Sequence, residues 1–215
     1  MSKYDTVVFD FDGVIADTAP DIIQSARRVI EMVGSTARSD EFIAKSIGGG
    51  ARKLLLRVLD PEFHDRMNEV LPEFVQYYDQ NCDVKTSLYP HVLEGLQRVK
   101  ARGFHTGLAT MKLRKATLKI CETLGITSYF DTVVTPEDVQ KPKPDPESIL
   151  KILDTVGSTV DKAILIGDTK TDILTAQNSG VDCAVVPYGY GNFKEMQLAG
   201  PTYVIQNLLE LDNIL

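Results

Sequence analysis

The chain has 215 residues, of which 43% are hydrophobic and 25% charged, and its net charge is -7. These values are typical of a globular protein with one large domain, or a core with a small insert. No concentrated basic patch of the kind that nucleic-acid binders use is present, and no apolar run reaches the roughly 20 residues of a membrane span. We therefore expect neither a nucleic-acid nor a membrane partner, and a monomer or weak homodimer.

The cysteines indicate the compartment. Cys82, Cys121 and Cys183 are widely spaced and form no C-x-x-C pair. That pattern argues against a disulfide framework and against a zinc site, and free thiols are typical of a reducing environment. The N-terminus is charged and lacks the features of a secretory signal. The sequence predicts a cytoplasmic protein.

A strand comes first and a helical segment follows it. A β-branched and aromatic run predicts a strand over Tyr4 to Phe9. Helical patterns then succeed one another over Asp21 to Met32, Ser39 to Ser46, Ala51 to Leu59 and Glu62 to Gln80. Asp60 and Pro61 have the residue types of an N-cap and a first helical position. We interpret residues 18–85 as a helical cap domain inserted into a core of residues 1–17 and 86–215.

The remainder alternates between helices and short apolar strands. Strands are predicted over Phe104 to Thr110, Asp131 to Thr135, Ala163 to Ile166 and Cys183 to Val186. Helices are predicted over His91 to Ala101, Leu113 to Leu124, Pro146 to Val156 and Thr171 to Ser179. Continuous apolar strands joined by helices are typical of buried parallel sheets. The predicted fold is α/β, a Rossmann-like parallel sheet with helices on both faces and an inserted helical cap.

Polar side chains follow the predicted strands. Asp10 and Asp12 follow the first strand, Thr110 ends the second, and Asp168 follows the strand that begins at Ala163. Ligands of open parallel sheets bind at the carboxyl ends of the strands, so these groups are expected to meet at one edge, with Asp172 and Lys141 nearby. Carboxylates this close repel one another unless a cation lies between them. Mg²⁺ suits such oxygen ligands and is often shared with a substrate phosphate, which Lys141 and Thr110 would hold.

Four ordered motifs resemble those of the haloacid dehalogenase-like superfamily. They are the run from Asp10 to Thr18, then Thr110, then Lys141 in Lys-Pro-Lys-Pro-Asp-Pro, and finally Gly167 to Asp172, which reads G-D-x-x-x-D. The resemblance covers nearly the whole chain and implies a Mg²⁺-dependent phosphohydrolase with a helical cap. It is carried by four motifs in the right order, because a D-x-D pair alone is a weak signal.

The resemblance implies a role for each motif residue. Asp10 would be the nucleophile that forms an aspartyl-phosphate, and Asp12 the general acid and base. Asp10, Asp168 and the backbone carbonyl of Asp12 would hold Mg²⁺, with Asp172 binding either directly or through water. Thr110 and Lys141 would hold the phosphoryl oxygens.

Several residues have alternative interpretations. Thr110 has the residue type of a helix N-cap, and Asp172 that of a capping residue. Lys143 repeats the Lys-Pro pattern two residues after Lys141 and is an alternative phosphate ligand. Asp17 is expected to brace the loop after the first strand. Three histidines match no motif and are interpreted as surface or packing residues: His64, His91 and His105.

The type of reaction follows from two positions. Relatives that cleave carbon–halogen or carbon–phosphorus bonds lack an acid like Asp12, so this residue indicates phosphate-ester chemistry. β-Phosphoglucomutase-like relatives carry a cap histidine where this chain has Ile22. Water is therefore the expected phosphoryl acceptor. A mutase and a non-catalytic phosphate-binding module remain the alternatives.

The cap is expected to select the substrate. Gly48, Gly49 and Gly50 allow close backbone approach to a ligand, and Arg52 has the charge to pair with a carboxylate or second phosphate. The alternative is a flexible loop followed by a solvated arginine. The stretch resembles a loop of phosphoglycolate phosphatases, which implies 2-phosphoglycolate as the substrate. Lys112 is also expected to face the substrate, together with Met111, where such phosphatases often carry a small polar residue.

Overall fold

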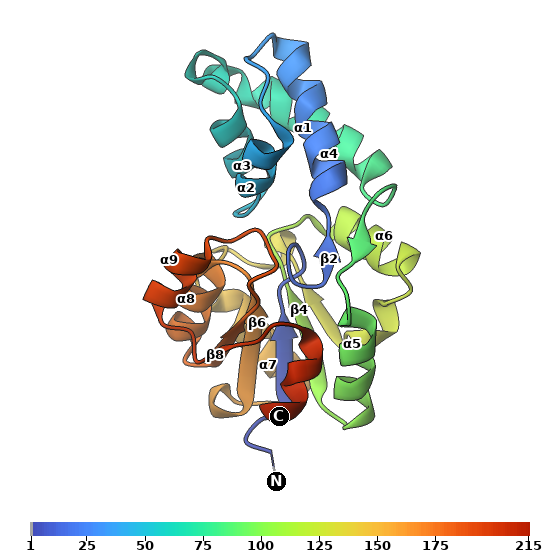
Figure 1. The fold of residues 1–215 in the computed structure, drawn as a ribbon, viewed down its shortest axis with the longest axis vertical. Coiled ribbons are helices and arrows are strands. Elements are labelled where there is room, and N and C mark those ends of the chain that lie inside the picture. Colours follow the sequence, from blue (N-terminus) through green and yellow to red (C-terminus); the bar gives the residue numbers. More distant parts are fainter. Residues whose placement is uncertain (1) are drawn as a thin grey trace.

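A six-stranded parallel sheet forms the core of the computed structural model, which describes residues 2–215. Its order is β5-β4-β1-β6-β7-β8 (Figure 1). The strands are β1 (Thr6–Phe9), β4 (His105–Ala109), β5 (Thr132–Val134), β6 (Ala163–Gly167), β7 (Asp182–Val185) and β8 (Tyr203–Val204). The chain runs to one side of β1 and then to the other, so β1 lies at the switch point where such sheets bind ligands.

Helices cover both faces of this sheet, as predicted. Val7 and Phe9 of β1 pack into one apolar cluster, and Val8 between them packs into a second, because alternate residues of a strand point to opposite faces. The first cluster includes α5 (Val92–Ala101), α6 (Arg114–Thr123) and the 3₁₀ turn Leu208–Asn213; the second includes α7 (Glu147–Val156), α8 (Lys170–Ser179) and α9 (Phe193–Ala199). The predicted α/β fold is confirmed.

The segment between β1 and α5 is mainly helical and stands beyond one end of the sheet (Figure 1). It contains α1 (Ala19–Val33), α2 (Asp40–Lys45), α3 (Ala51–Val58) and α4 (Met67–Asn81). The single helix predicted from Glu62 was wrong, because the 3₁₀ turn Pro61–Arg66 precedes α4. Asp60 does not cap that turn; its carboxylate instead accepts from the Thr36 amide at 2.7 Å and pairs with Arg38.

Two short strands join the helical segment to the sheet. β2 (Ala16–Asp17) and β3 (Ser87–Leu88) pair as an antiparallel ribbon. Next to it, the buried Asp21 carboxylate accepts from the amides of Lys85 and Thr86 at 2.9 and 2.8 Å. Asp21 thus links the start of α1 to the chain that leaves α4. The two segments that connect the helical region to the sheet are therefore held together.

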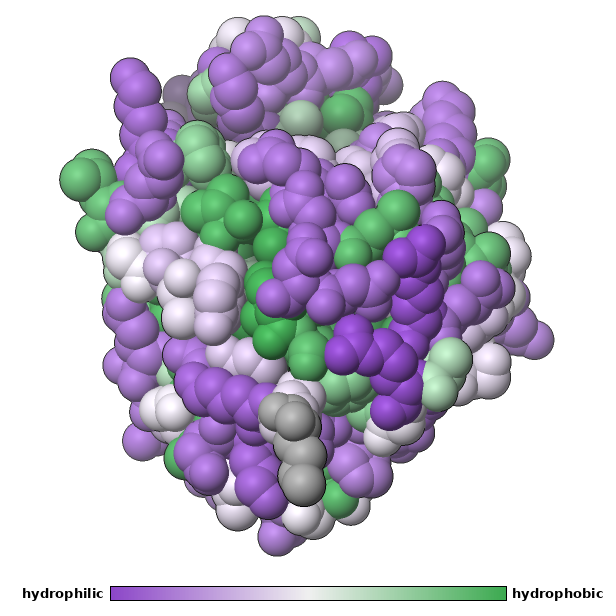
Figure 2. Space-filling view, turned by 60° about the horizontal axis from the view of Figure 1, so that its bottom comes forward, coloured by the Kyte–Doolittle hydropathy of each residue, from purple (hydrophilic) through white to green (hydrophobic). Residues whose placement is uncertain are grey.

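The end of the core that carries the termini is mainly hydrophilic on its surface, with apolar side chains interspersed (Figure 2). Within residues 2–215, no helix combines the length and the apolar character that a membrane crossing requires.

Candidate active site

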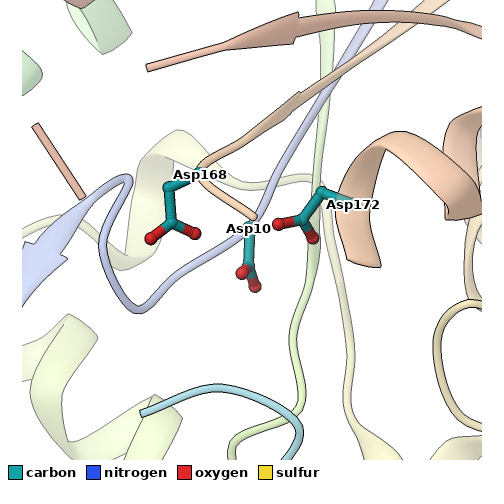
Figure 3. A group of neighbouring side chains, drawn as sticks. All are labelled: Asp10, Asp168 and Asp172. Carbon is teal, nitrogen blue, oxygen red and sulfur yellow. The ribbon is translucent and has the colours of Figure 1, made fainter. Parts of the chain in front are cut away.

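Three carboxylates converge at the carboxyl ends of β1 and β6. Phe9 and Ile166 are register partners on these adjacent strands, so Asp10 and Asp168, which follow shortly after, leave the sheet at the same edge. Asp172 reaches the same point from the first turn of α8 (Figure 3). Oxygens of the three side chains lie within 4.8 Å of one another, and all three residues are buried. The predicted meeting of these groups is observed.

This cluster has the donors that a hard cation requires. Asp168 Oδ2 accepts from the Tyr190 amide at 2.7 Å, whereas Asp168 Oδ1 is buried without a hydrogen-bond partner. An unpaired buried carboxylate oxygen is costly unless a cation or proton compensates it. Gly13 lets the loop after β1 approach Asp168 closely, because a Cβ there would lie 2.1 Å from Asp168 Oδ2, the oxygen that the Tyr190 amide holds. Asp10 and Asp168 therefore fit a divalent cation bound by oxygen.

Asp172 is engaged on both carboxylate oxygens. Its Oδ2 accepts from the amide and hydroxyl of Thr169, which completes the capping box of α8. Its Oδ1 accepts from Lys143 Nζ at 2.7 Å. Asp172 thus has the capping contacts considered from the sequence and also fixes a lysine at the cluster. Because both of its carboxylate oxygens are engaged, Asp172 is better placed to orient Lys143 or a metal-bound water than to bind a metal directly.

The lysine beside Asp10 is Lys143, so the placement predicted for Lys141 was wrong. Lys143 Nζ is buried 3.1 Å from Asp10 Oδ1. Lys141 is exposed, and its amide donates to Glu147 Oε2 in the turn before α7. The loop is anchored because Asn178 of α8 donates to the carbonyl of Pro144, which brings the preceding lysine against Asp172.

The electrostatics reflect burial and crowding. Burial is the largest effect on Asp10 and, together with Asp172 and Asp12 and against the opposing effect of Lys143, raises its pKa to about 7. Burial, with Asp172 and Asp10, also raises the pKa of Asp168 well above its usual value. Burial lowers the pKa of Lys143, but Asp10 and Asp172 outweigh it, so that pKa lies above the ordinary value. In the metal-free cluster, burial thus favours protons on Asp10 and Asp168, and Lys143 stays charged.

The metal-free protein should become less stable as pH rises toward neutrality. A carboxyl whose pKa is higher in the folded than in the unfolded state stabilises the fold at low pH, and this contribution is lost as pH rises toward the folded pKa. Because the pKa of Asp10 is raised to about 7, the free energy of unfolding of the metal-free protein should fall as pH rises from about 4 to 7. Asp168→Asn removes one buried charge and should raise the free energy of unfolding at pH 7.5 by about 1–3 kcal/mol.

Thermal unfolding in EDTA measures this effect. Asp154→Asn, an exposed change on α7, is the matched control and should leave the melting temperature unchanged. Adding Mg²⁺ should stabilise the original chain more than Asp168→Asn. An Asp168→Asn variant that melts lower in EDTA at pH 7.5 would show that the carboxylates do not repel as described.

Asp12 lies beside the cluster in a set of polar contacts. Thr18 Oγ1 donates to Asp12 Oδ1 at 2.6 Å, and Lys112 Nζ lies 3.0 Å from the same oxygen. Lys112 also donates to the Tyr78 hydroxyl of α4 at 2.7 Å. Lys112, expected to face the substrate, is therefore buried between Asp12 and Tyr78 of α4, although it still lines the cavity.

A cavity of about 360 Å³ opens between the cluster and the helical segment. Residues predicted to contact substrate line it: Gly49, Gly50, Arg52, Thr110, Met111 and Lys112. Lys141 does not. Thr110 is not an N-cap, because α6 begins after Leu113 and the Thr110 hydroxyl instead accepts from the Lys112 amide at 3.1 Å. Arg52 is exposed and forms no ion pair within residues 2–215.

Tyr190 is a site residue that the sequence interpretation did not single out. Its hydroxyl accepts from the amides of Thr18 and Ala19 at 2.8 and 2.9 Å and donates to Asp17 Oδ1 at 3.0 Å. Asp17 therefore braces the loop after β1, as predicted. The sequence signal that could have indicated this residue is the run Pro187 to Gly191, which reads Pro-Tyr-Gly-Tyr-Gly after β7. None of the three histidines lines the cavity, within residues 2–215.

The parallel sheet, its helical insert and the carboxylates at its switch point define an α/β protein with a carboxylate-lined candidate site. A family model described as haloacid dehalogenase-like hydrolase matches residues 7–186, and the chain belongs to this family. The family membership expected from the four motifs is thereby confirmed.

Individual relatives are similar over most of their length. A phosphoglycolate phosphatase of Aquifex aeolicus is 33% identical over 184 residues, covering 86% of this chain and 85% of the relative. One from Nitrosococcus oceani is 28% identical, covering 100% and 98%. A crystal structure described as a predicted phosphoglycolate phosphatase from Haemophilus somnus superposes with a TM-score of 0.91 at 24% identity, covering 100% and 99%. The last comparison concerns the fold alone.

Proposed function

We propose that this chain is a Mg²⁺-dependent phosphatase that hydrolyses a small phosphorylated metabolite through an aspartyl-phosphate at Asp10. The single observation that carries this proposal is the position of Asp10, which lies 3.1 Å from Lys143 Nζ beside the unpaired Asp168 oxygen. A carboxylate with a fixed cation and a metal site around it can attack phosphorus while the phosphoryl charge is neutralised. The names of the relatives support 2-phosphoglycolate as the first substrate to test.

The residues around Asp10 divide the first step between them. An Asp10 oxygen attacks phosphorus, and the bond to the leaving oxygen breaks as Asp12 gives that oxygen a proton. Lys143 is placed to hold the phosphoryl oxygens, and Thr110 lines the same cavity. Mg²⁺, bound by Asp10, Asp168 and the Asp12 carbonyl, would supply further positive charge to the phosphoryl group.

The second step returns the enzyme to its starting state. Asp12, now ionised, takes a proton from water, and the resulting hydroxide attacks phosphorus and releases Asp10. Thr18 and Lys112 hold Asp12 Oδ1 at 2.6 and 3.0 Å, which fixes the orientation of its carboxylate for both proton transfers.

The mutase alternative lacks a residue in the cap. Ile22 lines the cavity at the position where mutase-like relatives carry a histidine, and its side chain is buried and apolar. It cannot guide a proton to or from a second sugar hydroxyl, so water is the acceptor that we propose. The non-catalytic alternative is disfavoured because Asp10, Asp12, Lys143 and Asp168 are all present.

Phosphate release tests the proposal. The protein should hydrolyse p-nitrophenyl phosphate and 2-phosphoglycolate with Mg²⁺ and lose this activity in EDTA. A panel of phosphorylated sugars and acids extends the assay, and glucose 1-phosphate tests isomerisation directly. Binding of phosphate without turnover of any ester would favour the non-catalytic alternative, whereas isomerisation of sugar phosphates would favour the mutase.

Arg52 provides a specificity prediction. As an unpaired cation on the cavity wall, it is placed to pair with the carboxylate of 2-phosphoglycolate. Arg52→Ala should raise KM for this substrate about fivefold and for p-nitrophenyl phosphate much less, since exposed charge pairs contribute roughly 1 kcal/mol. Lys53→Ala is the control on the same helix, because Lys53 is exposed and does not line the cavity. Equal KM changes for both substrates in Arg52→Ala would assign Arg52 to packing.

We further propose that residues 18–85 act as a cap domain on a core of residues 1–17 and 86–215. Hinges near Thr18 and Lys85 are supported by the β2–β3 ribbon and by the hydrogen bonds of Asp21 to Lys85 and Thr86. These contacts would make the two connecting segments bend as one unit. Cap angles that stay identical with and without a phosphate analogue in solution would contradict this motion.

A further inference from the structure

The cap side of the cavity presents a continuous apolar surface. Leu71, Phe74 and Val75 lie on one face of α4, since residues three and four apart in a helix are neighbours. Ile22 of α1 and Leu54 of α3 line the same cavity. These five side chains form what we call the apolar wall. Figure 1 places their helices beyond the sheet edge at which the catalytic carboxylates lie.

The cap contributes little charge to this surface. Of its side chains that line the cavity within residues 18–85, only Arg52 and Asp79 are charged. Asp79 is paired with Lys115 at 3.1 Å, and Lys112 on the core side is occupied by Asp12 and Tyr78. An anionic group resting on the apolar wall would therefore lose water without gaining a partner.

The apolar wall is only partly accessible. Ile22, Leu54 and Phe74 are buried, whereas Leu71 and Val75 are partly exposed and line the same cavity as the catalytic carboxylates. Because these two side chains expose apolar surface in the cavity, they favour the binding of an apolar ligand group. The cavity volume of about 360 Å³ lies in the range of sites that take ligands considerably larger than a two-carbon acid.

We infer that the leaving group of the preferred substrate is a longer apolar alcohol, which lies on the apolar wall while its phosphate lies at Asp10. This inference rests on the proposed phosphatase function and specifies its substrate class. The enzyme hydrolyses such phosphate monoesters with a higher kcat/KM than 2-phosphoglycolate. Within residues 2–215, the one cation of the cavity lining without an ion pair that could bind the 2-phosphoglycolate carboxylate is Arg52.

A series of n-alkyl phosphates tests this inference on the unaltered protein. Ethyl, butyl and hexyl phosphate have leaving oxygens of nearly equal basicity, so differences in kcat/KM report contacts with the alkyl chain. We expect kcat/KM to rise about two- to fourfold per added methylene, and hexyl phosphate to exceed 2-phosphoglycolate. Equal values across the series, or a higher value for 2-phosphoglycolate, would overturn the inference.

A matched pair of variants locates the contact. Leu71→Ser should lower kcat/KM for hexyl phosphate several times more than for ethyl phosphate. Leu56→Ser, a change at a 36% exposed leucine of α3 outside the cavity, should leave the ratio unchanged. If Leu71→Ser leaves the ratio of kcat/KM for hexyl and ethyl phosphate unchanged, the alkyl chain does not lie on the apolar wall and the inference is overturned. If no ester, including p-nitrophenyl phosphate, is hydrolysed, the proposed phosphatase function fails rather than the assignment of the wall.

Discussion

Asp10→Asn is expected to lower kcat for phosphate release by about 10⁴-fold or more, because an amide cannot form the acyl-phosphate bond. The fold should persist, since the change removes a buried negative charge that the metal-free protein holds unfavourably. The melting temperature in EDTA should therefore stay the same or rise. Phosphate release and circular dichroism on the same preparations measure both effects.

Two results would contradict the role of Asp10. One is residual turnover within about tenfold of the original chain, which positioning alone does not explain. The other is an equal loss of kcat in Asp154→Asn, the exposed control on α7, because the loss in Asp10→Asn would then not be specific to Asp10.

Lys143→Met should lower kcat about 10²–10³-fold, whereas Lys141→Met should change it by less than about twofold. Removing one fixed positive group from the transition state has effects of this size. Only Lys143 lies beside Asp10 and Asp172, at 3.1 and 2.7 Å, while Lys141 is exposed. The two variants make the same chemical change two residues apart, so each controls for the other.

Stability provides a second test of the same pair. Lys143→Met leaves two buried carboxylates without their cation, and it should destabilise the metal-free protein by about 3–5 kcal/mol at neutral pH. Urea unfolding in EDTA measures this loss. A larger kcat effect in Lys141→Met, with Lys143→Met unaffected, would restore the assignment that the motif spacing suggested.

The fold was largely predictable because its signals are local. Apolar runs such as Val7 to Phe9 marked the central strands, and the Ser39 cap, which accepts from the Phe42 amide, marked the start of α2. Missing from the prediction were the short strands β2, β3 and β8, and helix α9. β8 has only two residues and lies at the sheet edge, where pairing with β7 rather than its own pattern defines it.

The site was less predictable wherever position depends on tertiary contacts. The repeated Lys-Pro pattern offers two lysines with equal local chemistry, and only the anchoring of the Pro144 carbonyl by Asn178 brings Lys143 to Asp172. Likewise, Leu71 and Val75 read as core positions of an amphipathic helix. Their contact with the active-site cavity depends on how α4 packs.

The covalent intermediate tests the central claim most directly. The protein would be mixed with a phosphate ester that it hydrolyses and Mg²⁺, quenched in acid within one turnover, digested and analysed by mass spectrometry. We expect a phosphoryl group on Asp10 in the peptide from the β1 end, and none in Asp10→Asn treated identically. Turnover with no phosphoryl group on Asp10, or with the group on another residue, would contradict the account.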